Sequence, residues 1–217
     1  MRNSRDAIRM PDLSLETAAR GAGHSVIAGL DEAGRGPWAG PVVAGAAVLD
    51  LMRLSPALRD GLDDSKRLKA AAREDLFKRL RGEARIGVGR AEVPEIDAHN
   101  ILQATLLAMA RAVAQIGVTP DIVLVDGNRE PPLTCSVQCI VGGDGRSLSI
   151  AAASVVAKVS RDRIMAELAV EYPGYGWERN AGYGTAEHRT ALECLGVTPE
   201  HRRSYKPVIK ILSRAQA

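Results

Sequence analysis

The sequence predicts an α/β domain built on a mixed sheet. Five short runs rich in apolar and β-branched residues fit strands, and segments of helical periodicity alternate with the last of them. The first two runs are joined by a short connection, which suits an antiparallel pair but not a parallel crossover. The 217 residues suffice for one domain with a sizeable core, which we place at residues 25–217.

The N-terminal part begins with a segment of low periodicity and continues with two strands. Residues 1–24 predict a flexible tail that includes a short helix at Leu13–Arg20. The apolar run Ser25–Asp31 predicts the first strand, and the small-residue run Pro41–Leu49 predicts the second. Glycine–proline pairs between them mark a turn, so we expect these strands to pair antiparallel.

The middle of the chain predicts two helices around a third strand. After a polar loop at Leu62–Lys66, residues Ala70–Arg81 fit a helix, Arg85–Val93 a strand and Asn100–Ile116 a second helix. A glycine directly follows each helix and fits a C-terminal cap. The second helix has an apolar face at helical spacing, formed by Leu102, Leu106, Met109, Val113 and Ile116.

The last part predicts two more strands and two helices. Ile122–Val125 and Ser136–Val141 fit strands, and Leu148–Val170 fits a long helix that a following proline ends. Gly174–Gly184 is a loop rich in glycine and tyrosine. Thr185 then fits the N-cap of a helix that reaches Leu195.

The composition, 46% hydrophobic and 25% charged residues, is that of an ordinary globular protein. No run of about 18 apolar residues predicts a membrane span, and the first residues lack the features of a secretory signal. We therefore expect a cytoplasmic protein. The three cysteines, Cys135, Cys139 and Cys194, fit neither a disulfide framework nor a zinc site, so we expect free thiols.

The net charge of +3, from 29 basic and 26 acidic residues, is a weak global signal for nucleic acid. Local basic clusters at Lys66–Lys69 and His201–Arg203 are better candidates for such contacts. Aromatic residues make up only 3% of the chain, so contacts with a backbone or groove fit better than base stacking. Nothing suggests an interface with a second copy, and we expect a monomer.

Acidic residues end three of the predicted strands. Asp31 and Glu32 end the first strand, Asp126 the fourth and Asp144 the fifth. Because ligands of open α/β sheets bind at the carboxyl ends of strands, neighbouring ends would bring four carboxylates together. A divalent cation would relieve their repulsion, and two such cations about 4 Å apart suit phosphodiester hydrolysis. The pattern therefore predicts a site for Mg²⁺ or Mn²⁺.

Other interpretations compete with this site. Each strand-end acid alone also fits a turn residue or a helix N-cap. Asp162 is a rival fourth acid, but it lies in a predicted helix between two arginines, where local ion pairing accounts for it. His188 and His201 do not have the spacing of metal ligands, and His188 fits a surface residue near a helix start.

The turn Gly34-Arg35-Gly36 follows the first pair of acids directly. Glycines allow a backbone to approach a phosphate or a sugar closely, and arginine supplies positive charge for the phosphate. The sequence thus predicts a turn that binds a polyanion beside a metal site.

Several ordered motifs resemble those of bacterial ribonuclease HII. They span about residues 25–208, and their number and order make a chance match improbable. The motifs are Asp31–Pro37, Ala39–Val42, Asp64–Lys66, Val125–Asn128, Gly143-Asp144, Ala151–Asp162, Gly182–Thr185 and His201–Ser204.

The resemblance implies the ribonuclease H fold, a mixed five-stranded sheet flanked by helices, with a small helical C-terminal part. It implies endonucleolytic cleavage, with Mn²⁺ or Mg²⁺, of the RNA strand of RNA–DNA hybrids and of single ribonucleotides embedded in duplex DNA. The cut falls on the 5′ side of a ribonucleotide and leaves a 3′-hydroxyl and a 5′-phosphate.

The resemblance also implies roles for individual residues. The metal ligands would be Asp31, Glu32, Asp126 and Asp144. The substrate-binding residues would be Gly34, Arg35 and Gly36 at the ribose 2′-hydroxyl, Tyr183 at the following sugar, and Lys66 and Arg203 at phosphates. One departure precedes the tyrosine, where the family often carries a lysine and this chain has Arg179-Asn180-Ala181.

Two other functions stay open at this stage. A junction-cutting or integrase-type nuclease could use the same fold, because a fold does not fix a substrate. A hybrid-binding protein that has lost catalysis is the second, although the presence of all four acids argues against it.

Overall fold

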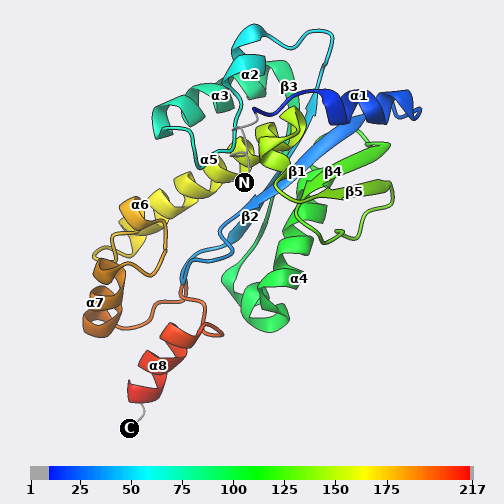
Figure 1. The fold of residues 1–217 in the computed structure, drawn as a ribbon. Helices are drawn as coiled ribbons and strands as arrows, with labels where there is room; N and C mark the ends of the chain where they lie inside the picture. The colour runs from blue at the N-terminus through cyan, green and yellow to red at the C-terminus, as the bar shows by residue number, and fades with distance from the viewer. Residues whose placement is uncertain (1–9, 216–217) are drawn as a thin grey trace, which may run out of the picture.

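The structure is a computed structural model that describes residues 10–215. At its centre lies a mixed five-stranded sheet in the order β3-β2-β1-β4-β5 (Figure 1). β2 pairs antiparallel with β1 and β3, whereas β4 runs parallel to β1 and β5. This confirms the predicted fold class and the antiparallel first pair. The strands are β1 (Ile27–Ala33), β2 (Val42–Leu49), β3 (Ala84–Ala91), β4 (Ile122–Asp126) and β5 (Ser136–Ile140).

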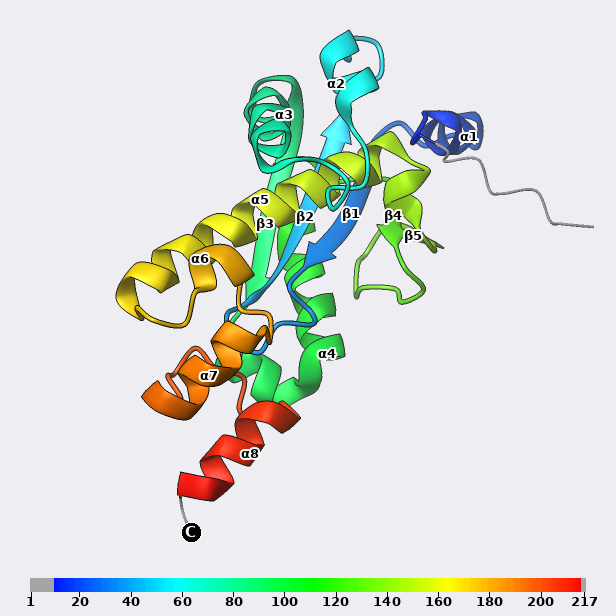
Figure 2. The same cartoon turned by 60° about the vertical axis from the view of Figure 1, so that its left-hand side comes forward.

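Two long helices cover opposite faces of the sheet (Figure 2). α5 (Leu148–Glu171) lies against β1 and β2, and α4 (Val93–Ala114) lies against β2 and β3. A Cβ atom added at Gly45 would lie 2.3 Å from a carbonyl oxygen of α5, and one added at Gly89 would lie 2.1 Å from a carbonyl oxygen of α4. Glycine in the strands therefore lets both helix backbones come close to the sheet.

α4 begins earlier than the helix predicted at 100–116. Glu92 caps it in a capping box with Glu95, which the prediction overlooked. The backbone leaves helical geometry at Asn100, where φ is 67°, and the Asn100 side chain accepts hydrogen bonds from the backbone N–H groups of Leu102 and Gln103. The predicted start at Asn100 thus marks a restart within a longer helix.

The buried face of α4 agrees only in part with the predicted one, since Met109 and Ile116 are buried as predicted. Ala104, Ala108 and Ala112 are fully buried, because only small side chains fit between the helix and the glycines of β3. Leu102 and Leu106 lie at the edge of the helix and line a hollow beside the sheet instead.

The shorter helices lie around this core. α3 runs through Gly82 instead of ending there, and the predicted N-cap Thr185 does cap α7. The sequence analysis missed α2 and α6, although Ser55 before a proline is a start signal for α2. The helices are α1 (Ser14–Gly21), α2 (Pro56–Gly61), α3 (Ala70–Glu83), the 3₁₀ turn η1 (Gly143–Gly145), α6 (Trp177–Asn180), α7 (Ala186–Leu195) and α8 (Lys206–Ala215).

The helix expected at Leu13–Arg20 is present as α1, and it docks on the domain. Its Glu16 side chain is buried and accepts hydrogen bonds from the Ser147 hydroxyl at 2.6 Å and the Ser149 backbone N–H at 2.9 Å. The part of the predicted tail from Asp12 to Gly21 is thus tied to the start of α5. Residues 1–9 of that tail lie outside the described residues.

Two sequence expectations concern the chain as a whole. The three cysteines are free thiols, as predicted. Within residues 10–215, no helix has the length and apolar character that crossing a membrane requires.

Candidate active site

Three of the predicted acids converge at one edge of the sheet. Asp31 lies near the end of β1, Asp126 ends β4, and Asp144 lies in η1 after β5. β1 and β4 are neighbouring parallel strands with Leu30 opposite Val125, so their aspartates arrive side by side. Ligand oxygens of the three aspartates lie within 4.8 Å of one another.

Without a cation, burial and mutual repulsion disfavour the ionised forms of these carboxylates. Burial raises the pKa of Asp31 well above its ordinary value, and the charges of Glu32 and Asp126 raise it further. Burial and then Asp126 also raise the pKa of Asp144. A divalent cation prefers oxygen ligands and would favour the ionised forms. The donor set therefore fits a divalent metal ion.

Glu32 is the fourth acid, next to Asp31 in β1. Its carboxylate accepts a hydrogen bond from Arg35 at 3.2 Å. Burial raises the pKa of Glu32, while Arg35 acts in the opposite direction. Glu32 thus adds negative charge beside Asp31 and links it to the glycine–arginine turn.

A loop after α2 places Lys66 near the acids. Its ammonium group lies 3.9 Å from an Asp144 oxygen, but the side chain is 74% exposed, so the pair is weak. The loop is held from below by Ser65, whose buried hydroxyl lies 2.7 Å from that of Ser154 in α5. Burial raises the pKa of Asp31 most, and the Ser154 hydroxyl acts in the opposite direction. These two serines were not singled out from the sequence.

The turn Gly34-Arg35-Gly36 is held by a buried arginine from the C-terminal part. The Arg202 guanidinium donates to the carbonyl oxygens of Gly34 at 2.5 Å, Arg35 at 3.0 Å and Gly40 at 2.9 Å. Arg202 is fully buried. It therefore fixes the turn through its backbone.

A second buried arginine, Arg161 of α5, holds the continuation of this turn. It donates to the carbonyl oxygens of Pro41 at 3.0 Å, Ala39 at 3.2 Å and Ala181 at 2.9 Å. No carboxylate of the described residues lies within salt-bridge distance of Arg161 or Arg202. Backbone carbonyl oxygens, and not carboxylates, are thus the direct partners of both guanidinium groups.

Tyr183 faces the same turn. Its side chain is half exposed, and a Cβ atom added at Gly36 would lie 3.4 Å from the tyrosine ring. Both residues line a hollow of about 260 Å³ together with Glu32, Lys66 and Arg161. Among the four acids, Glu32 lines this hollow, which therefore extends from Glu32 to the turn and to the tyrosine.

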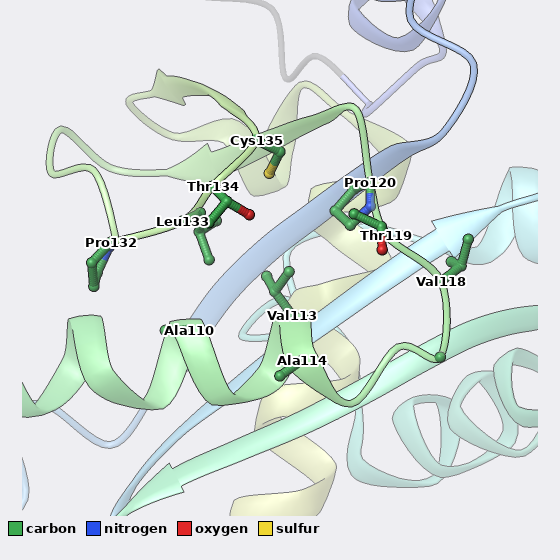
Figure 3. Close-up of a pocket in the computed structure, with 11 residues that line it drawn as sticks. Ala110, Val113, Ala114, Val118, Thr119, Pro120, Pro132, Leu133, Thr134 and Cys135 are labelled. Carbon is green, nitrogen blue, oxygen red and sulfur yellow. The ribbon is translucent and has the colours of Figure 1, made fainter.

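Two other hollows differ in their distance from the acids: the first borders them and the second does not. One of about 350 Å³ is lined by Glu32 and Asp126 with apolar residues of α4 and Arg129. Another of about 440 Å³ lies between the C-terminal end of α4 and the segment before β5, and no acidic residue lines it (Figure 3). Only the first borders the acids.

Comparison with known proteins decides the family. A family model described as Ribonuclease HII matches residues 28–208. The chain belongs to the ribonuclease HII family. It is 59% identical to the ribonuclease HII of Rhodospirillum rubrum over 208 residues, which cover 95% of this chain and 94% of that protein. It is 58% identical to that of Ruegeria pomeroyi, with 93% and 85% covered.

The fold agrees with this assignment. The crystal structure of ribonuclease H2 from Pyrococcus horikoshii matches with a TM-score of 0.75 and 28% identity, covering 88% of this chain and 99% of that one. As a member of the ribonuclease HII family, the chain is a metal-dependent endoribonuclease that acts on RNA–DNA hybrids. This confirms the function class that the sequence motifs implied.

The structure brings together most residues that the ribonuclease HII motifs singled out, but not all. Arg203 is exposed and lines neither hollow beside the acids. Asp162 stays outside the acidic group and pairs with Lys158 at 2.7 Å and Arg73 at 3.7 Å, and not with its flanking arginines. The expectation that His188 is a surface residue is wrong, because its side chain is fully buried.

Proposed function

We propose that the chain cuts on the 5′ side of a ribonucleotide, both in RNA–DNA hybrids and at single ribonucleotides embedded in duplex DNA. The observation that supports this most directly is the shared hollow, in which Glu32 meets the turn at Gly34–Gly36 and Tyr183. A phosphodiester at the acids would place its ribose on the turn and the next sugar near the tyrosine. Reaction and recognition would then occupy one continuous surface.

Asp31, Glu32, Asp126 and Asp144 would hold Mn²⁺ or Mg²⁺, because buried carboxylates at this spacing are suitable oxygen ligands. Bound there, the cation would lower the pKa of an attacking water and stabilise charge on the phosphate. Burial raises the pKa of Asp31 and of Asp144, so the bound cation would also have to offset the cost of keeping these carboxylates ionised.

The remaining residues would bind and orient the substrate. Backbone groups of Gly34–Gly36 would contact the ribose 2′-hydroxyl, the one group that distinguishes RNA from DNA at this position. Tyr183 would stack on the sugar after the ribonucleotide, and Lys66 and Arg203 would contact phosphates. We further propose that the protein acts as a monomer. Its three free thiols fit a reducing compartment, and we propose that it acts in the cytoplasm.

A labelled DNA duplex with one ribonucleotide tests this function. We expect a cut on the 5′ side of the ribonucleotide with Mn²⁺ or Mg²⁺ and none with EDTA. Cleavage of four-way junctions but not of this duplex would favour a junction nuclease. Binding without cleavage in either metal would indicate a protein that has lost catalysis.

A further inference from the structure

Two histidines contact each other beneath Tyr183, and the reaction as proposed uses neither. His188 belongs to α7, and His201 lies in the segment between α7 and α8. Their Nε2 atoms are 3.1 Å apart, and both side chains are fully buried. Such a pair requires that one nitrogen carries a hydrogen and the other does not.

The surrounding hydrogen bonds determine which nitrogens carry the hydrogens. The Thr198 backbone N–H donates to His201 Nδ1 at 3.0 Å, so the hydrogen of His201 lies on Nε2 and points at His188. His188 Nε2 must then accept, and it also accepts from Trp177 Nε1 at 3.1 Å. The hydrogen of His188 therefore lies on Nδ1, which donates to the Tyr183 carbonyl oxygen at 3.0 Å.

This chain of hydrogen bonds ends on the backbone of the residue that faces the glycine–arginine turn. The Tyr183 carbonyl oxygen also accepts from the Thr185 N–H at 2.8 Å, and the Tyr183 N–H donates to Asn180 at 2.9 Å. Among the described residues, His188 supplies the one side-chain hydrogen bond to this backbone, from the interior of the C-terminal part. It therefore restrains the carbonyl on the side away from the solvent.

His201 is also joined to the segment that follows the turn. It forms a β-bridge with Ala39, and the next residue, Arg202, donates to carbonyl oxygens of the turn. One dipeptide thus connects to both substrate-facing elements, to Tyr183 through His188 and to the turn through Arg202.

We propose that His188 and His201 are positioning residues that hold Tyr183 at its distance from the Gly34–Gly36 turn. This inference rests on the proposed function, in which the turn contacts the ribose and Tyr183 the next sugar. The pair acts in its neutral form, with one defined hydrogen position on each ring. Its effect is expected in the preference for a single embedded ribonucleotide, which requires both contacts at once.

Two substitutions of His188 separate positioning from stability. An asparagine places an amide N–H near the position of Nδ1 and can donate to Tyr183, but it leaves Trp177 and His201 without their acceptor. A glutamine places its oxygen near the position of Nε2 and keeps that acceptor, but it loses the donor to Tyr183. We therefore expect His188→Asn to be less stable than His188→Gln. We also expect its substrate preference to be closer to that of the wild-type protein.

The measurement is the rate on a duplex with one ribonucleotide divided by the rate on a continuous RNA–DNA hybrid. We expect His188→Gln to lower this ratio about tenfold, equivalent to about 1.4 kcal/mol, and His188→Asn to leave it nearly native. In a Tyr183→Ala background, neither substitution should change the ratio further. If the ratio instead follows stability, so that His188→Asn is the worse variant, the histidines are structural only.

A spectroscopic measurement on the unmodified protein covers the case in which a variant does not fold. Imidazole ¹⁵N spectra should show His188 with its hydrogen on Nδ1 and His201 with its hydrogen on Nε2. Both rings titrating near pH 6.5 would overturn the inference, because solvent would then reach the pair. If the wild-type protein does not cut the one-ribonucleotide duplex, the proposed function fails; if it cuts and only the histidine results disagree, the inference alone fails.

Discussion

Replacing Arg202 by methionine tests whether a buried cation fixes the substrate-facing turn. The change keeps most of the side-chain length but removes the donor to the carbonyl oxygens of Gly34, Arg35 and Gly40. The Arg35 carbonyl oxygen still accepts from the Tyr205 hydroxyl at 2.6 Å, so two carbonyls, those of Gly34 and Gly40, lose their partner. Each buried carbonyl left without a partner costs about 1–3 kcal/mol, so the two together cost roughly 2–6 kcal/mol. Methionine avoids the desolvation of a guanidinium, which offsets several kcal/mol of this loss.

The net expectation for Arg202→Met is a loss of about 1–3 kcal/mol, which lowers the Tm by roughly 2–12 °C for a domain of this size. At a temperature where the variant is still folded, kcat/KM should fall about 100-fold, because the turn is no longer held in position. Thermal unfolding and cleavage of the one-ribonucleotide duplex measure the two effects. Arg203→Met is the matched control for stability, because the neighbouring side chain is exposed. A Tm for Arg202→Met equal to that of Arg203→Met, together with a kcat/KM equal to that of the wild-type protein, would refute the role of Arg202.

Three further predictions concern the acids and the tyrosine. Asp126→Asn should abolish cleavage and leave binding of a hybrid largely intact in a gel-shift assay; cleavage near the wild-type rate would exclude Asp126 as a metal ligand. Tyr183→Ala should reduce cleavage of a single embedded ribonucleotide more than that of a continuous hybrid, and equal losses would remove the tyrosine from junction recognition. Because burial raises the pKa of Asp31 and Asp144, the metal-free folded protein holds protons that the unfolded chain has lost, so its stability falls as the pH rises above about 4. Mn²⁺ displaces those protons, so its addition should raise the Tm more at pH 8 than at pH 5, and an equal rise at both pH values would contradict the assignment.

The acids could be predicted because local sequence and a general rule of topology agree there. An apolar run ending in Asp31 and another ending in Asp126 each indicate a strand, and parallel neighbours bring such ends together. The buried face of α4 could not be predicted in this way. Its leucines match a helical period as well as its alanines do, and only the glycines of the distant strand β3 decide which of them lies inside.

The sequence gives a weaker indication of the residues that position the site, such as Arg202 and His188. Arg202 lies in a basic run that suggests an exposed surface, yet its side chain turns inward to carbonyl oxygens more than 160 positions away in the sequence. His188 follows a helix N-cap closely, a position that is usually exposed, and is buried by the partner that His201 provides. Such placements depend on pairs that no local pattern contains, which is why the structural roles of these two residues were not predicted.

The buried arginines Arg161 and Arg202 bind backbone carbonyl oxygens, and this type of partner suits a turn that binds a polyanion. Burial and then repulsion by Arg202 lower the pKa of Arg161 to about 10, which still leaves it charged at neutral pH. A carboxylate partner would hold the side chain equally well but would cancel its charge below the Gly34–Gly36 turn. Carbonyl oxygens satisfy the same donors and leave the positive charge to act on a nearby polyanion. The two buried arginines therefore fix the position of the Gly34–Gly36 turn and place positive charge beneath it. This charge lies beside the acids, where a nucleic acid backbone would have to bind.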